Sequence, residues 1–510
     1  MLLNSRNNDH ESLYQQGLSH FDKEEYNEAI NCYKKSLAIK PDFFQAWNNL
    51  GLVYHEKEEF RQAIACYKKV LEINSEDIIS LNNIGRTLTE RKKFAEAIDY
   101  YKKALDIDSN FHLAWFNMGN AYYGKGQIND AIDCYKKTLD IKPSNFEAWN
   151  NLGLTYIDKG YFDKAIECFQ MVVKINPDYH QAWYNLGNAY SIQGEYPKAI
   201  NSYEKVLKIM PSFEPIWNNL GNMYSALEDF DQAIMCYRKA IDRNPSNSAA
   251  WYNIGLVNHD KGEYKQAVFF YKKAAEIKKD YFEALYNLGE CYYELKDFKK
   301  SVESYKDAIK SKPDYVNAWF NLGATYEELK MYKEALTCYE RVIKLDKRDY
   351  QTWVIIGNIY EILEKNDEAI SCYKKAINIQ PDFIEAWHKI GLIYINLENY
   401  DEVINSFKKV VSIDDKNLVA WNNLAFAYQI QGNNQVALDC NKKALEITDY
   451  KDAYSWYNYA CTLSILGLTK EAIKAIKAAI KLDSKFKELA KESTDFDNVR
   501  DEKEFKTIVN

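Results

Sequence analysis

Apolar and polar residues along this chain follow a helical period, and the whole pattern repeats every 34 residues. In one unit Trp149, Leu152 and Tyr156 have the spacing i, i+3, i+7, which places them on one face of a helix. A second apolar stripe follows in the same unit, with Ala165 and Phe169 four residues apart. The pattern therefore predicts two amphipathic helices in each unit and essentially no strand.

We number the unit so that tryptophan stands at position 4, and fourteen such units run from about His10 to Phe486. All 11 tryptophans occupy this position: Trp47, Trp115, Trp149, Trp183, Trp217, Trp251, Trp319, Trp353, Trp387, Trp421 and Trp456. Glycine stands at position 8 of twelve consecutive units: Gly17, Gly51, Gly85, Gly119, Gly153, Gly187, Gly221, Gly255, Gly289, Gly323, Gly357 and Gly391. We interpret positions 4, 7, 8 and 11 as the core face of the first helix, with glycine admitting a close neighbour.

Two further residue types mark the helix ends. A glycine recurs at position 15, as at Gly126 and Gly160, where a left-handed residue would end the first helix. A proline recurs at position 32, as at Pro143 and Pro177, where it would end the second helix.

The series Trp183, Leu186, Gly187, Tyr190, followed by an alanine, an aromatic residue and a proline, resembles the tetratricopeptide repeat. The resemblance covers more than 90 per cent of the chain. It implies an all-α fold in which about fourteen helix–turn–helix units stack into a right-handed solenoid with a concave groove.

The ends of the chain depart from the pattern, as the terminal repeats of a solenoid often do. We expect residues 1–9 to form a disordered or frayed tail and residues 10–486 to form the superhelix, with one extra residue before repeat 14. We interpret Asn441, where an aromatic residue is usual, as part of the more polar end. Residues 487–510 leave the repeat, and we expect them to cap the last apolar face around Phe496 and Phe505.

Composition excludes several classes of protein. The net charge of −8 argues against a general nucleic-acid binder, and no run approaches the ~20 apolar residues of a membrane span. Eight of the ten cysteines stand at one repeat position, and equivalent residues of stacked helices lie too far apart for disulfides or shared metal ligation. We therefore expect a cytoplasmic protein with free thiols, without metal or cofactor and without enzymatic activity.

Positions 2, 5, 6, 9, 12 and 13 form what we call the first-helix face, opposite the assigned core face. In the tetratricopeptide repeat family this face lines the groove. Position 6 is asparagine in nine successive repeats: Asn49, Asn83, Asn117, Asn151, Asn185, Asn219, Asn253, Asn287 and Asn321. The series resembles the asparagine ladder in the superhelix of O-linked N-acetylglucosamine transferase, which grips the backbone of an extended polypeptide. No segment here resembles that enzyme's catalytic domain, and these asparagines could instead serve helix packing.

The first-helix face of repeats 2–10 is also acidic and aromatic. Ten carboxylates against the single base Arg86 give it a charge near −9. As candidate peptide-binding residues beside the asparagines we take three acids and five aromatic residues: Glu290, Glu294, Glu327, Phe116, Tyr184, Tyr252, Tyr286 and Phe320. Acids interleaved with aromatic rings favour a neutral or basic polypeptide, although a merely solvated acidic face is the alternative.

One known role of the family is not expected. Co-chaperones with these repeats bind the carboxylate tails of heat-shock proteins through lysine at positions 2 and 5 and arginine at position 6. Here position 5 is never lysine, and position 6 is basic only at Lys389. The sequence thus favours a non-catalytic adaptor that binds an extended, neutral-to-basic polypeptide. The alternatives are a scaffold that self-associates or stacks in a larger assembly, and a targeting domain for a separate enzyme.

Overall fold

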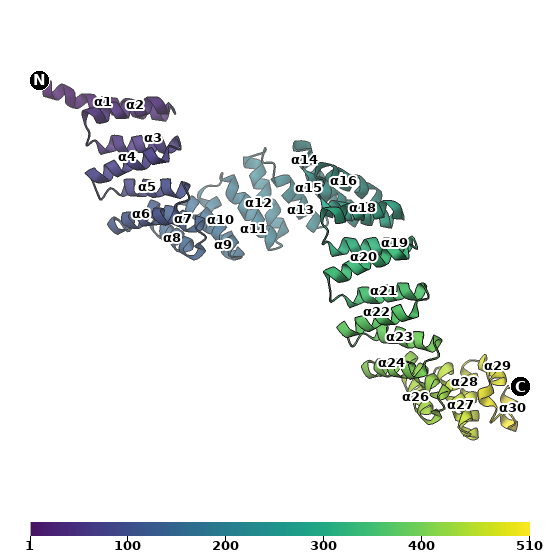
Figure 1. Cartoon of the computed structure of the whole chain (residues 1–510). Coiled ribbons are helices and arrows are strands. Elements are labelled where there is room, and N and C mark those ends of the chain that lie inside the picture. The colour runs from purple at the N-terminus through teal and green to yellow at the C-terminus, as the bar shows by residue number, and fades with distance from the viewer. Residues whose placement is uncertain (1, 510) are drawn as a thin grey trace. The chain divides into compact units, whose positions relative to one another are not determined.

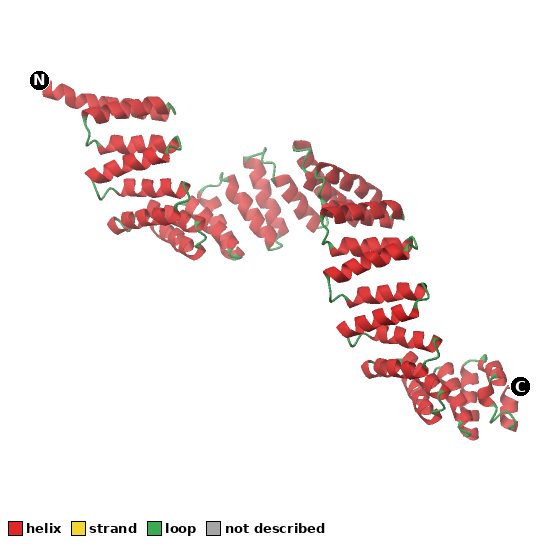
Figure 2. Cartoon of the chain, in the orientation of Figure 1, coloured by secondary structure: helices red, strands yellow, loops and turns green. Residues whose placement is uncertain are grey.

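The computed structural model describes the backbone of residues 2–509 and the side chains of residues 9–509, and over this range it contains helices and turns but no strand (Figure 2). Each repeat contributes two consecutive helices that lie side by side (Figure 1). The first helix begins at Leu2, so residues 2–9, which we expected to form a tail, extend it. No proline or glycine interrupts that segment, and Met1 lies outside the described residues.

The chain divides into two units within α15, the first ending at Val257 and the second starting at Asn258. In the first unit the helices are α1 (Leu2–Asp22), α2 (Tyr26–Ile39), α3 (Phe44–Glu56), α4 (Phe60–Ile73), α5 (Ile78–Glu90), α6 (Phe94–Ile107), α7 (His112–Gly124), α8 (Ile128–Ile141), α9 (Phe146–Asp158), α10 (Phe162–Ile175), α11 (His180–Ile192), α12 (Tyr196–Ile209), α13 (Ile216–Ala226) and α14 (Phe230–Arg243), followed by α15 (Ser248–Asp260) across the boundary.

The second unit continues the same alternation. Its helices are α16 (Tyr264–Ile277), α17 (Phe282–Glu294), α18 (Phe298–Ser311), α19 (Val316–Glu328), α20 (Tyr332–Leu345), α21 (Tyr350–Ile362), α22 (Asn366–Ile379), α23 (Ile384–Asn396), α24 (Tyr400–Ile413), α25 (Leu418–Ile430), α26 (Asn434–Ile447), α27 (Ala453–Ile465), α28 (Thr469–Leu482), α29 (Phe486–Glu492), the 3₁₀ turn η1 (Thr494–Phe496) and α30 (Lys503–Val509). Odd numbers up to α27 are therefore the first helices of repeats 1–14, and even numbers up to α28 are the second helices.

The turn inside each repeat requires a left-handed residue. At Gly126 and Gly160 the φ angles are +81° and +73°, which confirms the role expected for position 15. Where this position is not glycine the backbone keeps the same conformation, with φ near +58° at Lys92 and Lys330. Such a φ is unfavourable for residues with a Cβ, so packing of the two helices imposes the turn even without glycine.

The turn between repeats follows the prolines. Helix α8 ends at Ile141, and Lys142, directly before Pro143, leaves the helix with φ of −130°. The proline ring disfavours the helical conformation of the residue before it, so the helix ends where the sequence predicts. The carbonyl of Pro143 then accepts a hydrogen bond from Trp149 Nε1 at 2.9 Å, which anchors the indole to the turn.

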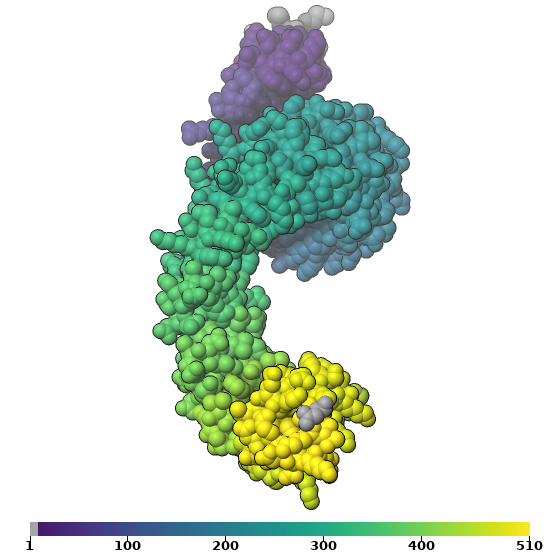
Figure 3. Space-filling model, turned by 90° about the vertical axis from the view of Figure 1, so that its right-hand side faces the viewer, coloured from purple at the N-terminus to yellow at the C-terminus, as the bar shows by residue number. Residues whose placement is uncertain are grey.

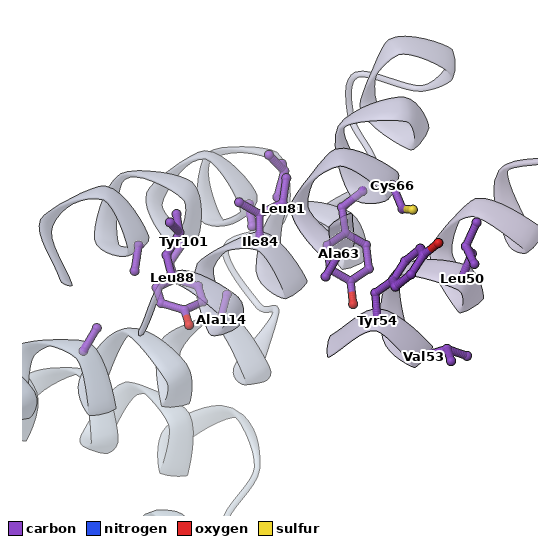
Figure 4. Close-up of a cluster of buried hydrophobic side chains, with 14 of the residues drawn as sticks. Leu50, Val53, Tyr54, Ala63, Cys66, Leu81, Ile84, Leu88, Tyr101 and Ala114 are labelled. Atoms are coloured by element: carbon purple, nitrogen blue, oxygen red, sulfur yellow. The ribbon is translucent and has the colours of Figure 1, made fainter. Parts of the chain in front are cut away.

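The core face of the first helix is rotated relative to our assignment. Positions 7 and 8 are buried as expected, but positions 3 and 10, as at Ala148 and Thr155, are also fully buried. Tryptophan at position 4 is only half-buried in every repeat that has one. Small residues at positions 3 and 10 admit the neighbouring helices, and the large indole is left at the edge of the core. Figure 4 shows one such core, with side chains from α3 to α7 that include Ile84 and Tyr101.

Glycine at position 8 gives room to one ring. A Cβ on Gly187 would lie 2.5 Å from Cε1 of Tyr203, which comes from the second helix of the same repeat. In repeat 13 the glycine is replaced by Ala425 and the aromatic by the smaller Asn441, so the pair changes together. Asn441 is buried and donates to Thr462 Oγ1 at 2.8 Å, which corrects our interpretation of it as part of a more polar end.

The C-terminal segment covers the last repeat. Phe486, Phe496 and Phe505 are buried in one cluster with residues of α27 and α28, and the rings of Phe496 and Phe505 stack at 5.4 Å. Helices α29 and α30 contact α28, and η1 contacts α27. In Figure 3 this yellow segment forms the surface at its end of the second unit. The apolar face that a fifteenth repeat would cover is occupied by the chain itself.

All ten cysteines are free thiols, and all except the half-buried Cys32 are buried. Burial raises the pKa of Cys66, Cys134 and Cys168 to about 12. In the described part of the chain, the helices all lack the combination of length and apolar character that crossing a bilayer requires.

Candidate functional site

The asparagines at position 6 lie at the boundary between consecutive repeats. Asn49 Nδ2 donates to the Tyr14 hydroxyl at 2.8 Å, and Asn117 Nδ2 donates to Asn82 Oδ1 at 2.9 Å. In both pairs the acceptor stands at position 5 of the preceding repeat. The same bond joins Asn185 to Asn150 at 3.1 Å and Asn321 to Tyr286 at 2.9 Å, and Asn219 makes a longer one to Tyr184 at 3.4 Å.

A second acceptor stands at position 9 of the preceding repeat. Asn151 Nδ2 donates to Asn120 Oδ1 at 3.0 Å, and the buried Tyr135 hydroxyl donates to the same oxygen at 2.8 Å. Asn219 in repeat 7 and Asn253 in repeat 8 form the same arrangement. Their shared acceptors are Asn188 and Asn222. One oxygen thus joins a tyrosine of its own repeat to an asparagine of the following repeat.

These bonds show that the position 6 asparagines contribute to packing between repeats. We expected the amides to be exposed toward a ligand, whereas Asn185 is only 8% exposed and the other eight are half-buried. Asn287 contacts the Tyr271 hydroxyl at 3.4 Å, while Asn83 makes no side-chain hydrogen bond to the described residues. Removing one amide should therefore cost stability, about 0.5–1.5 kcal/mol for a single hydrogen bond. An amide has two donor and two acceptor positions, so one bond across the boundary does not exhaust it.

The position 5 aromatic residues are half-buried between helices. The ring of Tyr286 lies 5.7 Å from Tyr305 in its own repeat and 5.1 Å from Tyr315, the residue directly before α19. Phe116 and Phe320 pack in the same way on Tyr135 and Tyr339, Tyr184 packs on Tyr203 and Phe213, and Tyr252 is half-buried. Four of the five candidate aromatics thus pack on a ring from the second helix of their own repeat.

Two carboxylates of repeats 2 and 3 share one cation within the protein. Arg86 Nη2 lies 3.2 Å from Glu56 Oε1, and Arg86 Nε lies 3.6 Å from Glu90 Oε1. His55, whose side chain is 4% exposed, lies 3.0 Å from Glu90 Oε1 through Nε2 and 3.0 Å from Thr87 Oγ1 through Nδ1. Burial, followed by the Arg86 charge, lowers the pKa of His55 below its usual value.

The carboxylates of repeats 9 and 10 have hydroxyl partners instead of cations. Glu290 Oε1 accepts from the Tyr286 hydroxyl at 2.8 Å, and Glu327 accepts a short hydrogen bond from Tyr339. Burial raises the pKa of Glu327, and the neighbouring Glu328 raises it further. Glu294 is exposed and has no partner among the described residues. The sequence alone could not distinguish these acids from Glu56 and Glu90, which pair with Arg86.

Comparison with known repeat families accounts for this periodic geometry. A model described as a TPR repeat matches residues 17–58, 119–160, 153–192, 258–296, 290–330 and 357–398. Other models, described as tetratricopeptide repeats, match residues 42–110, 100–133, 180–213, 215–247, 236–269, 316–349, 384–417, 418–448 and 453–486. The chain belongs to the tetratricopeptide repeat family. The resemblance drawn from the tryptophan, glycine and tyrosine spacing is thereby confirmed.

Several solved structures align with this chain. MamA is 32% identical over 32% of this chain and 95% of its own, with a TM-score of 0.31. YrrB, whose structure is described as a TPR protein with an unusual peptide-binding site, is 26% identical over 36% of this chain and 95% of its own, with a TM-score of 0.34. Cut9, in its complex with Hcn1, aligns over 82% of this chain and 96% of its own at 14% identity and a TM-score of 0.32. Among curated proteins, none matches this chain.

Sequence reasoning overlooked an apolar part of the first-helix face. Repeats 11 to 13 place five exposed aliphatic and aromatic side chains at positions 2, 9 and 13: Ile362, Leu392, Val419, Phe426 and Ile430. In the first two of these repeats position 6 is Ile355 and Lys389 and no longer asparagine. No change of pattern marks these residues in the sequence, because positions 9 and 13 are also apolar in earlier repeats, as at Leu154 and Ile192.

A pocket recurs on the other side of the repeats, between neighbouring second helices. One such pocket, of about 790 Å³, is lined by Trp149, Leu152 and Tyr156 of α9 together with Lys136 and Cys168. Pockets of about 550, 400 and 260 Å³ use the same positions around Trp115, Trp47 and Trp319. The half-buried indoles at position 4 therefore form outer pockets bordered by the lysines of the second helices. Within residues 9–509, His, Cys, Asp and Glu side chains form no group of three or more that could hold a metal ion.

Proposed function

We propose that this chain is a non-catalytic adaptor that binds an extended, neutral-to-basic polypeptide along the first-helix face of its second unit. The observation that carries the proposal is that Glu290, Glu294 and Glu328, on the first helices of repeats 9 and 10, have no lysine or arginine partner among the described residues. An acidic face beside aromatic edges complements a cationic chain and excludes an anionic one.

The lengths are compatible with an extended ligand. Neighbouring helices lie about 8–10 Å apart, and an extended chain advances about 3.3 Å per residue, so each repeat would meet about three ligand residues. The acids of repeats 9 and 10 are followed by the apolar side chains of repeats 11 to 13. A ligand of about twelve residues with basic and apolar parts would use both.

The proposal can be tested by fluorescence anisotropy with labelled twelve-residue peptides of basic, neutral and acidic composition. Glu294→Lys, on the first-helix face of repeat 9, should weaken the basic peptide by about 3- to 10-fold, since it replaces an attractive charge by a repulsive one. Glu303→Lys, on the second helix of the same repeat, makes the same change in net charge and should leave affinity nearly unchanged. Equal effects of the two substitutions, or equal binding of all three peptides, would reject the first-helix face as the binding surface.

The outer pockets favour a second candidate function, a scaffold that self-associates. Their floors of tryptophan, leucine and tyrosine are partly exposed, and lysines border them, as where Lys306 Nζ lies 5.7 Å from the Tyr326 ring. Such a surface suits an acidic partner surface or another copy of the chain. Light scattering at two salt concentrations separates the candidates, because an adaptor remains monomeric at both, whereas a charge-driven scaffold forms oligomers that dissociate at high salt.

A further inference from the structure

A pocket of about 340 Å³ opens on the first-helix face among repeats 8, 9 and 10. Six of its lining residues are His259, Glu290, Tyr293, Glu294, Tyr305 and Asn321, and no lysine or arginine lines it. Its volume is at the lower end of the range for pockets that hold small ligands, about 300–1,000 Å³. It is therefore large enough for one long side chain.

Two carboxylates from the same helix line this pocket. Glu290 and Glu294 are four residues apart on α17, so they lie on one side of it. Glu290 Oε1 accepts from the Tyr286 hydroxyl at 2.8 Å and lies 3.5 Å from Asn321 Nδ2, whereas its Oε2 has no partner among residues 9–509. Two acids with unused oxygens in one pocket favour a ligand that donates several hydrogen bonds and carries positive charge.

The buried Tyr305 is a further polar residue of the pocket. It is only 1% exposed and lines the pocket; burial raises the pKa of its hydroxyl, and hydrogen bonding with Asn321 and Ser301 lowers it in part. In repeats 4, 6, 7 and 11 the equivalent tyrosine donates to an asparagine at position 9, as Tyr203 does to Asn188 at 2.7 Å. In repeat 9 that position is Glu290, which accepts from Tyr286 instead. Tyr305 therefore lacks the asparagine acceptor of those repeats, and it lines the pocket.

The aromatic wall suits a planar cation. The Tyr293 hydroxyl donates to Glu328 Oε1 at 3.3 Å, which holds the ring in place. Lys296 Nζ already lies 5.5 Å from the centre of this ring, within the distance of a cation–π contact. A guanidinium has five N–H donors in one plane, which can reach two carboxylates and a hydroxyl together, whereas an ammonium is a point charge with three donors.

We propose that the pocket formed by Glu290, Tyr293, Glu294, Tyr305 and Asn321 binds one arginine side chain of a polypeptide ligand. This assignment rests on the proposed function, because it identifies a residue that the bound chain would contribute. The carboxylates pair with the guanidinium, the Tyr305 hydroxyl accepts one of its N–H groups, and the Tyr293 ring packs against its plane.

The test uses a probe that needs no knowledge of the natural ligand. The full chain with ¹³C-labelled tyrosine rings is titrated with N-acetyl-arginine methylamide, and the Tyr293 and Tyr305 signals are assigned through Tyr→Phe substitutions. Tyr305→Phe is a conservative change, because Phe169 and Phe407 occupy the same position in repeats 5 and 12. We expect both signals to shift saturably and the uncharged citrulline analogue to bind at least tenfold more weakly.

Two double variants distinguish binding in the pocket from general attraction of the probe to an acidic surface. Glu290→Gln with Glu294→Gln should abolish saturable binding of the arginine probe. Glu283→Gln with Glu385→Gln removes the same charge from first-helix positions outside the pocket and should change affinity less than twofold. Tyr305→Phe should weaken the probe by about 3- to 10-fold. The assignment is overturned if citrulline or lysine analogues bind as well as arginine, if the pocket variant matches the control, or if the two tyrosine signals do not move.

A second measurement distinguishes failure of this assignment from failure of the proposed function. Twelve-residue peptides with a single central arginine or citrulline are compared with the free probes. Tight binding of both peptides, without preference for arginine, would refute the pocket and leave the adaptor function standing. Saturable binding of the free arginine probe, with no gain in affinity for the arginine peptide, would support the pocket and refute binding of an extended chain.

Discussion

Repeats 2–3 and repeats 9–10 carry carboxylates at the same positions of their first helices but use them differently. Position 13 is Glu56 and Glu90 in the first pair of repeats, and Glu294 and Glu328 in the second. Between the acids of each pair stands position 9 of the later repeat, which is Arg86 in repeat 3 and Ala324 in repeat 10. Arg86 reaches both neighbouring acids, at 3.2 and 3.6 Å, whereas Ala324 reaches none.

The comparison shows that one residue, at position 9, decides whether the position 13 acids have a cationic partner within the protein. Total charge counts do not reveal it, because the acids of both regions contribute equally to the count. The cation that pairs with two position 13 acids stands at position 9 of the later repeat, between those acids. On an acidic face built from repeats, the partners of each acid are therefore best examined separately at every boundary between two repeats.

Ala324→Arg should have the largest effect, because it copies the arrangement of Arg86 into repeat 10. An arginine there can pair with Glu294 and Glu328 and would also occupy the pocket. We expect affinity for a basic twelve-residue peptide to fall about 10- to 100-fold, which corresponds to losing one or two charge-assisted hydrogen bonds. Anisotropy titration measures this. Ala324→Met fills the same space without charge, and an equal loss with methionine would attribute the effect to size.

Lys92→Gly and Lys330→Gly should stabilise the two regions by similar amounts. Both lysines are exposed and have φ angles near +58°, which glycine adopts without strain. The relief of roughly 1–2 kcal/mol of strain is partly offset by the greater flexibility of unfolded glycine, so we expect a net gain of about 0.5–1 kcal/mol at each site. Denaturant unfolding measures the gain. Peptide affinity should not change, and any change would mean that the turn geometry influences the binding surface.

Arg86→Ala should make the N-terminal region resemble the C-terminal one. It frees Glu56 and Glu90, and we expect weak new binding of N-acetyl-arginine methylamide near α3 and α5. Exposed ion pairs contribute about 0.2–1 kcal/mol, so the gain in affinity should be only about 1.5- to 5-fold at low salt. Backbone amide shifts of the two helices report the binding. If the amides of α3 and α5 respond to the probe as they do in the unsubstituted protein, removing the cation is not sufficient to create a site.

The smallest effect should come from protonation of His55, which changes the local stability of the first-helix pair α3 and α5. The pKa of His55 is lowered in the folded state, so the unfolded chain binds the proton more readily. The contribution of the neutral ring to stability is complete above the ordinary pKa of about 6.5 and is lost as the pH falls through that value toward the folded pKa. Hydrogen exchange of α3 and α5 should therefore accelerate between pH 7.5 and 5.5, after correction for the intrinsic rate. His55→Gln should remove the acceleration, and an unchanged pH dependence in that variant would place the titrating group elsewhere.

Much of the fold was readable from local chemistry. The helix pair of each repeat, the left-handed turn at Gly126 and the helix end before Pro143 each depend on residues close together in the chain. Glycine at position 8 and tyrosine at position 24 belong to one repeat as well, so their contact follows from the same unit. The order and number of repeats needed no knowledge of long-range contacts.

What the sequence by itself determined is thus the repeating unit: its period, its two helices, its turns and the polar character of one face. Only the tertiary structure decided the rotation of the first helix, which buries positions 3 and 10 and leaves Trp149 at an outer pocket. It also decided that Asn151 bonds to the preceding repeat, that Arg86 pairs with two acids and that Tyr305 lines a pocket. The physical reason is that these features arise where one repeat meets the next, and the partners across that boundary are set by how closely the helices pack. Periodicity within a single unit carries no information about that distance.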